Sequence, residues 1–152
     1  MMNEKENILV SACLLGAHCR YDGECQNILE FEEKLSELMQ RYHLVPFCPE
    51  IYGGLQTPRN PAEIRDGKVY DNQGTNVTDQ FLRGAEEALA MAQRFHCEKA
   101  VLKMRSPSCG SGHIYDGTFS KVLIEGDGMT AGLLKQHGID VYGEADIEKL
   151  LK

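Results

Sequence analysis

Residues 7–13 read NILVSAC, a short apolar run with branched side chains and no alternation between apolar and polar positions. This pattern is typical of a strand that is buried on both faces, as in a parallel sheet covered by helices. Runs of the same kind follow at residues 43–48 (HLVPFC) and 99–103 (KAVLK), and a shorter one at residues 140–142 (DVY). We therefore expect four strands in a mostly parallel sheet.

Segments with helical spacing separate these strands. Apolar residues recur at that spacing in residues 28–42, and Thr78 is positioned to cap a strong helix that ends near Phe95. Two more helices are predicted at residues 129–136 and 144–151. Alternating strands and helices predict an α/β fold, namely a single three-layer domain with right-handed, Rossmann-like crossovers and long active-site loops.

Two long segments rich in glycine and proline interrupt the alternation. Residues 49–77 are predicted to form an ordered loop with a hairpin around Asp66-Gly67. Residues 104–120 are predicted to form a second loop, with short strands at residues 113–115 and 118–120. Loops of this length inside a compact domain are usually functional or disordered, so a site is expected there.

The size and charge of the chain limit its class. Its 152 residues suit one domain, residues 1–152, with a core of its own. The net charge of -7 argues against a nucleic-acid partner, because phosphate contacts require an excess of lysine and arginine. No apolar run approaches the roughly 20 residues that span a bilayer, which argues against a membrane protein. The start, MMNEKENILVSACLLG, lacks the basic region of a signal peptide, so we expect a cytoplasmic protein.

Three of the six cysteines stand where a predicted strand gives way to a loop: Cys13 in SACLLG, Cys48 in FCPE and Cys109 in SPSCG. The carboxyl ends of parallel strands share one crevice, so these thiols can converge. In a reducing compartment the pattern favours metal or catalytic use over core packing. Three thiolates suit a soft metal centre, and an iron–sulfur cluster held by three would leave one iron for substrate. A structural zinc site is less favoured because the sequence contains no CxxC pair.

The other three cysteines carry weaker signals. Cys97 lies between a helix and a strand, where a cysteine usually acts as a small hydrophobic residue. Cys19 and Cys25 lie in the first polar loop, which places them either near the site or on the surface as free thiols.

Polar residues beside the cysteines could supply acid–base chemistry. Glu50 stands two residues after Cys48, where a carboxylate would face a metal held by that thiol, although a surface salt bridge is the alternative. Ser106 and Ser108 flank Pro107, which stiffens the loop before Cys109. Their hydroxyls could donate hydrogen bonds to sulfur or to a substrate oxygen, or simply stabilise a turn.

Four basic residues lie beside the predicted site in an otherwise acidic protein: Arg20, Arg59, Lys103 and Arg105. Each alone is most simply a solvated surface charge. Together they predict a small anionic or polar ligand at the rim. The sequence has neither a Walker-type phosphate loop nor a GxGxxG motif, so no nucleotide-binding loop of these kinds is expected.

An ordered series of motifs runs through the chain: SACLLGxxCRYDG, FCPExxGGLxTPRxPAEI, GxxVTxxFxxGA, LKxRSPSCG, IYDGTF and GDGxTAxLL. This series resembles the DUF523 proteins, which are similar to the TudS-type thiouracil desulfidases. The resemblance extends from about Ile8 to Glu144.

The resemblance implies a [4Fe-4S] cluster and the removal of sulfur from a thiolated pyrimidine. By motif, Cys13, Cys48 and Cys109 are the implied cluster ligands, Glu50 the acid/base and Ser106 a second catalytic residue. The implied reaction is hydrolytic, with the sulfur leaving through the iron that carries no protein ligand. Ser108, Lys103, Arg105 and Arg59 are then expected to contact the substrate, a thiouracil or its nucleoside or nucleotide.

Two other classes of function remain open from the residues. The chain could bind a metal, a cluster or sulfur without catalysis, as a carrier or sensor. It could also be a metal-free enzyme that uses one reactive thiol. A coloured cluster in anaerobically purified protein would exclude the second class, and turnover of a thiouracil would exclude the first.

Overall fold

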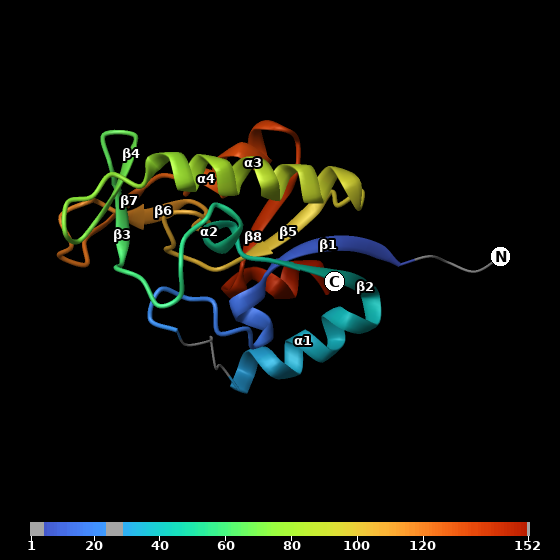
Figure 1. Cartoon of the computed structure of the whole chain (residues 1–152). Helices are drawn as coiled ribbons and strands as arrows, with labels where there is room; N and C mark the ends of the chain where they lie inside the picture. Colours follow the sequence, from blue (N-terminus) through green and yellow to red (C-terminus); the bar gives the residue numbers. More distant parts are fainter. Residues whose placement is uncertain (1–4, 24–28, 152) are drawn as a thin grey trace.

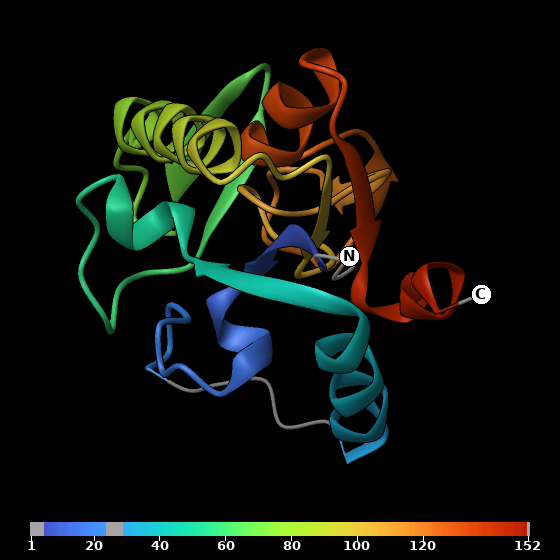
Figure 2. The same cartoon turned by 90° about the vertical axis from the view of Figure 1, so that its right-hand side faces the viewer.

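The computed structural model describes residues 5–23 and 29–151. Its centre is a four-stranded parallel sheet in the order β2-β1-β5-β8 (Figures 1 and 2). The strands are β1 (Glu6–Ser11), β2 (Tyr42–Phe47), β5 (Lys99–Leu102) and β8 (Asp140–Gly143). Because β1 has a partner on each side and a helical layer on each face, its last four residues are all buried. This burial explains the run without alternation in NILVSAC.

Helices cover both faces of the sheet, as the sequence predicted. Figures 1 and 2 show α3 (Thr78–Arg94) and α4 (Met129–Gln136) on one side, and α1 (Leu29–Arg41) with the C-terminal 3-10 helix η2 (Glu144–Leu150) on the other. Ile28, where the first helix was expected to begin, lies outside the described residues. Within the described ranges, no helix combines the length and the apolar character that crossing a membrane requires.

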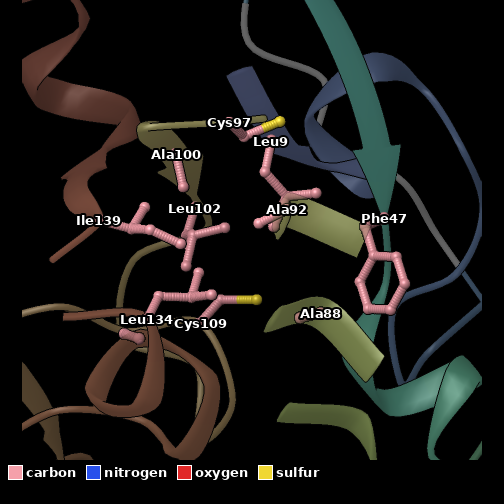
Figure 3. Packing of buried hydrophobic residues seen from close by; sticks show 11 residues of the cluster. Leu9, Phe47, Ala88, Ala92, Cys97, Ala100, Leu102, Cys109, Leu134 and Ile139 are labelled. Carbon is pink, nitrogen blue, oxygen red and sulfur yellow. The ribbon is translucent and has the colours of Figure 1, made fainter. Parts of the chain in front are cut away.

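The two faces of the sheet form two hydrophobic cores. Figure 3 shows the core between the sheet and α3 and α4, to which β1, β2 and β5 contribute Leu9, Phe47, Ala100 and Leu102. Cys97 is buried in this core, and burial raises the pKa of its thiol to about 11. The prediction that Cys97 acts as a small hydrophobic residue is confirmed. The opposite core holds the remaining buried side chains of the sheet together with α1 and η2: Ile8, Val10, Cys13, Leu14, Leu38, Val101, Ile147 and Leu150.

The long segment after β2 contains more structure than a loop. It opens with the short helix α2 (Pro49–Tyr52) and continues into a hairpin of β3 (Ala62–Arg65) and β4 (Lys68–Asp71). The turn of this hairpin is Asp66-Gly67, with φ values of 53° and 75°, as the sequence predicted. The prediction that Thr78 caps α3 is wrong, because Thr78 is already helical and its Oγ1 accepts the backbone N–H of Val69 instead.

A second hairpin consists of β6 (His113–Tyr115) and β7 (Leu123–Glu125). The strand expected at residues 118–120 is wrong. Glu63 Oε1 accepts the backbone N–H groups of Gly117 and Phe119, at 3.0 and 3.1 Å, so these donors are not available to a ladder. The backbone of Phe119 also has a φ of 58°, which is incompatible with a strand.

Glycines bring α2 close to α3. A Cβ atom at Gly84 would lie 2.0 Å from the carbonyl oxygen of Pro49, and one at Gly53 would lie 2.0 Å from that of Gln80. Both contacts are with backbone atoms, so a side chain at either position would push α2 away from α3. The position of Glu50 on α2 therefore depends on these two glycines.

We expect Gly84→Ala to lower the free energy of unfolding by about 1–3 kcal/mol, as overpacking does. Gly132→Ala is the matched control in α4, because a Cβ there meets only an ordinary contact at 3.6 Å. The control should be neutral or stabilising, since alanine favours a helix over glycine. Urea denaturation of both variants measures the difference, and equal stabilities would contradict the close approach of α2 and α3.

Candidate active site

The carboxyl ends of β1, β2 and β5 lie side by side and open into one cavity of about 430 Å³. Cys13 follows β1 in the 3-10 turn η1 (Ala12–Leu15), and Cys48 directly follows β2. Cys109 lies in the loop after β5. All three cysteines line the cavity, so the structure brings them together at the edge of the sheet where open α/β folds place their ligands.

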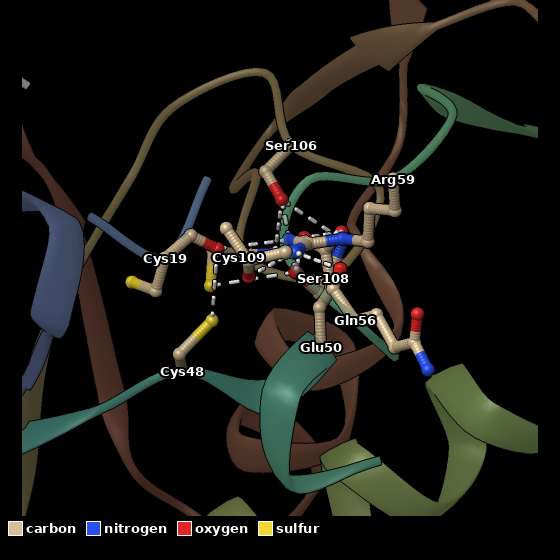
Figure 4. Close-up of polar contacts among 9 residues, drawn as sticks. Cys19, Cys48, Glu50, Gln56, Arg59, Ser106, Ser108 and Cys109 are labelled. Carbon is tan, nitrogen blue, oxygen red and sulfur yellow. Dashed lines mark hydrogen bonds and ion pairs between the residues drawn. The ribbon is translucent and has the colours of Figure 1, made fainter. Parts of the chain in front are cut away.

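A fourth thiol shares the cavity. Cys19 lies in the loop after η1, and its carbonyl oxygen accepts a hydrogen bond from the Cys48 thiol at 3.8 Å (Figure 4). From the sequence, Cys19 was either near the site or on the surface, and the structure places it in the site. Cys25 lies outside the described residues.

Hydrogen bonding and burial raise the pKa values of the Cys19, Cys48 and Cys109 thiols, which favours their protonated forms. Hydrogen bonding with Cys13 is the main cause that raises the pKa of Cys19, and hydrogen bonding with Cys19 is the main cause that raises the pKa of Cys48. Burial raises the pKa of Cys109 to about 12, against hydrogen bonds from Ser11 and Ser108 that lower it. A metal that binds here must displace these protons, because the thiolate is the form that coordinates.

Glu50 projects from α2 towards the loop that carries Cys109 (Figure 4). Its Oε2 accepts the hydroxyl of Ser108 at 2.9 Å, and the Oγ atoms of Ser108 and Ser106 are 2.9 Å apart. Ser106 Oγ accepts the backbone N–H groups of Ser108 and Cys109, both at 3.1 Å. Since the Ser108 hydroxyl donates its hydrogen bond to Glu50, Ser106 is the donor between the two hydroxyls, and they form a directed chain that ends on the carboxylate.

The loop that carries the two serines is fixed by α4. The first backbone N–H groups of this helix donate to loop carbonyls, from Met129 to Pro107 at 2.8 Å and from Thr130 to Ser108 at 2.8 Å. These bonds satisfy donors that a helix start leaves open. They also hold the serines at a fixed distance from the helix.

The four basic residues predicted at the rim all line the cavity, but they differ in their contacts. Arg59 forms an ion pair with Glu50 at an N–O distance of 3.0 Å, and Lys103 forms one with Glu144 at 3.4 Å. Arg20 lies 3.7 Å from a carboxylate oxygen of Asp22. Arg105 is exposed, with a φ of 64°.

Ser11 and Phe119 are among the cavity residues that sequence reasoning missed. Ser11 is buried at the end of β1, and its Oγ accepts the backbone N–H of Lys103 at 2.9 Å. Phe119 also lines the cavity, and its backbone N–H donates to Glu63 Oε1. The IYDGTF motif contains Phe119, but neither periodicity nor composition indicates that its ring reaches the cavity.

Among the described residues, no three His, Cys, Asp or Glu side chains are close enough to hold a single metal ion. The four thiols therefore share a cavity without forming a compact site for one ion.

Comparison with known proteins identifies the family. The model of the 2-thiouracil desulfurase family matches residues 8–146. The uncharacterized protein YbbK of Bacillus subtilis (strain 168) is 42% identical over 154 residues, covering 95% of this chain and 99% of that protein. A solved structure, the [4Fe-4S]-dependent thiouracil desulfidase TudS (DUF523Vcz), is 45% identical with a TM-score of 0.87, covering 96% of this chain and 95% of the other. These matches confirm the resemblance drawn from the motifs and the α/β fold, and the chain belongs to the 2-thiouracil desulfurase family.

Proposed function

We propose that this protein is a [4Fe-4S]-dependent desulfidase that hydrolyses the C–S bond of a thiolated pyrimidine. The observation that carries the proposal is the hydrogen-bonded chain of Ser106, Ser108 and Glu50 in the same cavity as the thiols of Cys13, Cys48 and Cys109. The family match supports the reaction, and the cluster named for the related TudS structure supports the cofactor.

The residues of the cavity fit such a cluster. Thiolates are the ligands that iron–sulfur clusters prefer, and Cys13, Cys48 and Cys109 come from three strand ends around one space. Each ligand of a cluster binds a different iron atom, so the sulfurs need not meet at one point. The described thiols are too far apart to hold a single ion, and this separation is compatible with a cluster. When bound, the cluster would supply an iron without a protein ligand, a Lewis acid with affinity for soft sulfur.

The protein's own residues would handle the water and its protons. The reaction consumes one water and releases one hydrogen sulfide, so the C=S bond is replaced by C=O with no oxidant or reductant. Glu50 is the proposed general base that takes a proton from the attacking water. Ser106 and Ser108 end their hydrogen-bonded chain on this carboxylate, so they would hold it in position.

The rim would recognise the rest of the substrate. The ring of Phe119 lines the cavity, and aromatic side chains stack on free pyrimidines. Arg105 and Lys103 both line the cavity. Arg105 is exposed, and Lys103 forms an ion pair with Glu144. These cations would favour a base with exposed carbonyls or an anionic substituent such as a phosphate.

Anaerobic incubation in ¹⁸O water tests the proposal. Cluster-loaded protein is assayed with 2-thiouracil, 4-thiouracil and their nucleoside monophosphates. We expect sulfide and oxo-pyrimidine in equal amounts, with ¹⁸O in the new carbonyl group. Sulfide without ¹⁸O would contradict hydrolysis. Cluster-loaded protein that turns over no thiolated pyrimidine would instead support a carrier of sulfur or of the cluster.

A further inference from the structure

We propose that Arg59 is a positioning residue, which orients Glu50 and fastens the loop of residues 17–23 to the wall of the cavity, and that it does not bind substrate. The proposal rests on the desulfuration proposed above. It reverses the expectation from the sequence, in which Arg59 was a cation available to a ligand. The side chain is 9% exposed, and Glu50 beside it is 17% exposed, so this ion pair is largely shielded from water.

The hydrogen bonds of Arg59 use its whole guanidinium group, which carries five N–H donors. Nε and one N–H of Nη2 donate to Glu50 Oε1, at 3.2 and 3.0 Å. The other N–H of Nη2 donates to the carbonyl oxygen of Cys19 at 3.1 Å. Nη1 donates to the carbonyl oxygen of Gln56 and to Thr57 Oγ1, both at 3.1 Å. Every donor has an acceptor within the protein, so no donor is left for a substrate.

These contacts fix which oxygen of Glu50 faces the cavity. Both donors to the carboxylate go to Oε1, and Oε2 accepts the hydroxyl of Ser108. The carboxylate cannot rotate without breaking bonds on both oxygens. Arg59 thereby presents one oxygen of the proposed base to the serines, in one orientation (Figure 4).

Arg59 also joins two loops that are far apart in sequence. Its backbone N–H donates to the carbonyl oxygen of Tyr21 at 2.6 Å, in addition to the bond from Nη2 to Cys19. The Cys48 thiol donates to the same carbonyl oxygen of Cys19. The loop that Arg59 holds therefore lies directly beside the cavity thiols. Losing the guanidinium would free this loop on one side and Glu50 on the other.

Lysine cannot replace this arrangement. Its three donors radiate from a single nitrogen, whereas the four acceptor atoms around Arg59 surround a planar group and belong to three segments. A residue that only supplied positive charge to a substrate would tolerate lysine. A positioning residue that bridges separate acceptors would not.

The kinetics of Arg59→Gln and Arg59→Lys test the proposal. We expect kcat to fall by about 10²-fold in both variants, because misplacing a catalytic group by about 1 Å has effects of that size. KM should change by less than about threefold, since no substrate contact is lost. Arg105→Gln, at the exposed rim, should show the opposite pattern of raised KM and retained kcat. Arg83→Gln, exposed on α3, is the matched control that should leave both unchanged.

Hydrogen–deuterium exchange provides a reading that does not depend on turnover. We expect peptides covering residues 17–23 to exchange faster in both Arg59 variants than in the wild type, and at the wild-type rate in Arg83→Gln. If the wild type turned over no thiolated pyrimidine, the proposed function would fail. Faster exchange in the Arg59 variants would still support the positioning role of Arg59. Three results would each overturn the positioning role: a raised KM with unchanged kcat in the Arg59 variants, full activity of Arg59→Lys, or unchanged exchange of residues 17–23. Should Arg59→Gln not fold, Arg59→Lys gives the same readings.

Discussion

Replacing Cys13, Cys48 or Cys109 by alanine is expected to abolish cluster binding and, with it, all desulfuration. Each change removes one of three ligands from a centre that is bound only through thiolates. The measurement is the broad absorbance at about 400 nm of anaerobically reconstituted protein, together with its iron and sulfide content. All three variants should be colourless, and activity should be lost to the limit of detection.

Two other cysteines are the controls for this experiment. Cys97→Ala removes a buried thiol outside the cavity and should keep the cluster, at some cost in stability. Cys19→Ala removes a thiol from inside the cavity. The motifs imply three ligands without Cys19, so this variant should also keep the cluster. A colourless Cys19→Ala protein, or a Cys109→Ala protein with full iron content, would contradict the proposed ligand set.

Glu50→Gln is expected to leave the cluster absorbance intact and to lower kcat by about 10²-fold or more, the effect of losing a general base. Glutamine has nearly the same shape, and its amide oxygen can still accept from Arg59. The effect is therefore chemical rather than structural. Single-turnover sulfide release, measured at equal cluster content, checks the prediction.

Glu86→Gln provides the matched comparison, because Glu86 is an exposed carboxylate on α3, and the change should have no effect on sulfide release. Full activity of Glu50→Gln would remove this carboxylate from the mechanism. Loss of the cluster in Glu50→Gln would instead give Glu50 a structural role.

The sequence predicts well where burial alone decides the structure. NILVSAC and HLVPFC are apolar without alternation, and they became neighbouring parallel strands whose ends carry Cys13 and Cys48. Asp66-Gly67 formed the predicted turn because both residues tolerate positive φ. The convergence of the three cysteines in one cavity followed from the same logic of strand ends.

Contacts between segments that are distant in sequence were not predicted. Residues 118–120 were expected to form a strand, but Glu63, more than fifty positions earlier, accepts the backbone N–H of Phe119. Nor did the sequence indicate that Arg59 donates a hydrogen bond to the carbonyl oxygen of Cys19, forty positions away. The local sequence pattern does not indicate hydrogen bonds between such distant residues. These hydrogen bonds become visible only when the segments are packed against each other in the folded structure.

Cys13 and Cys109 belong to different hydrophobic cores, one on each face of the sheet. Both side chains fill apolar volume in the same way as other buried side chains. We therefore expect the folded state to persist without a cluster, unlike that of small zinc domains, which unfold when metal is removed. A chain made under iron limitation would keep its tertiary structure as an apoprotein. This apoprotein would acquire iron and sulfide later without refolding.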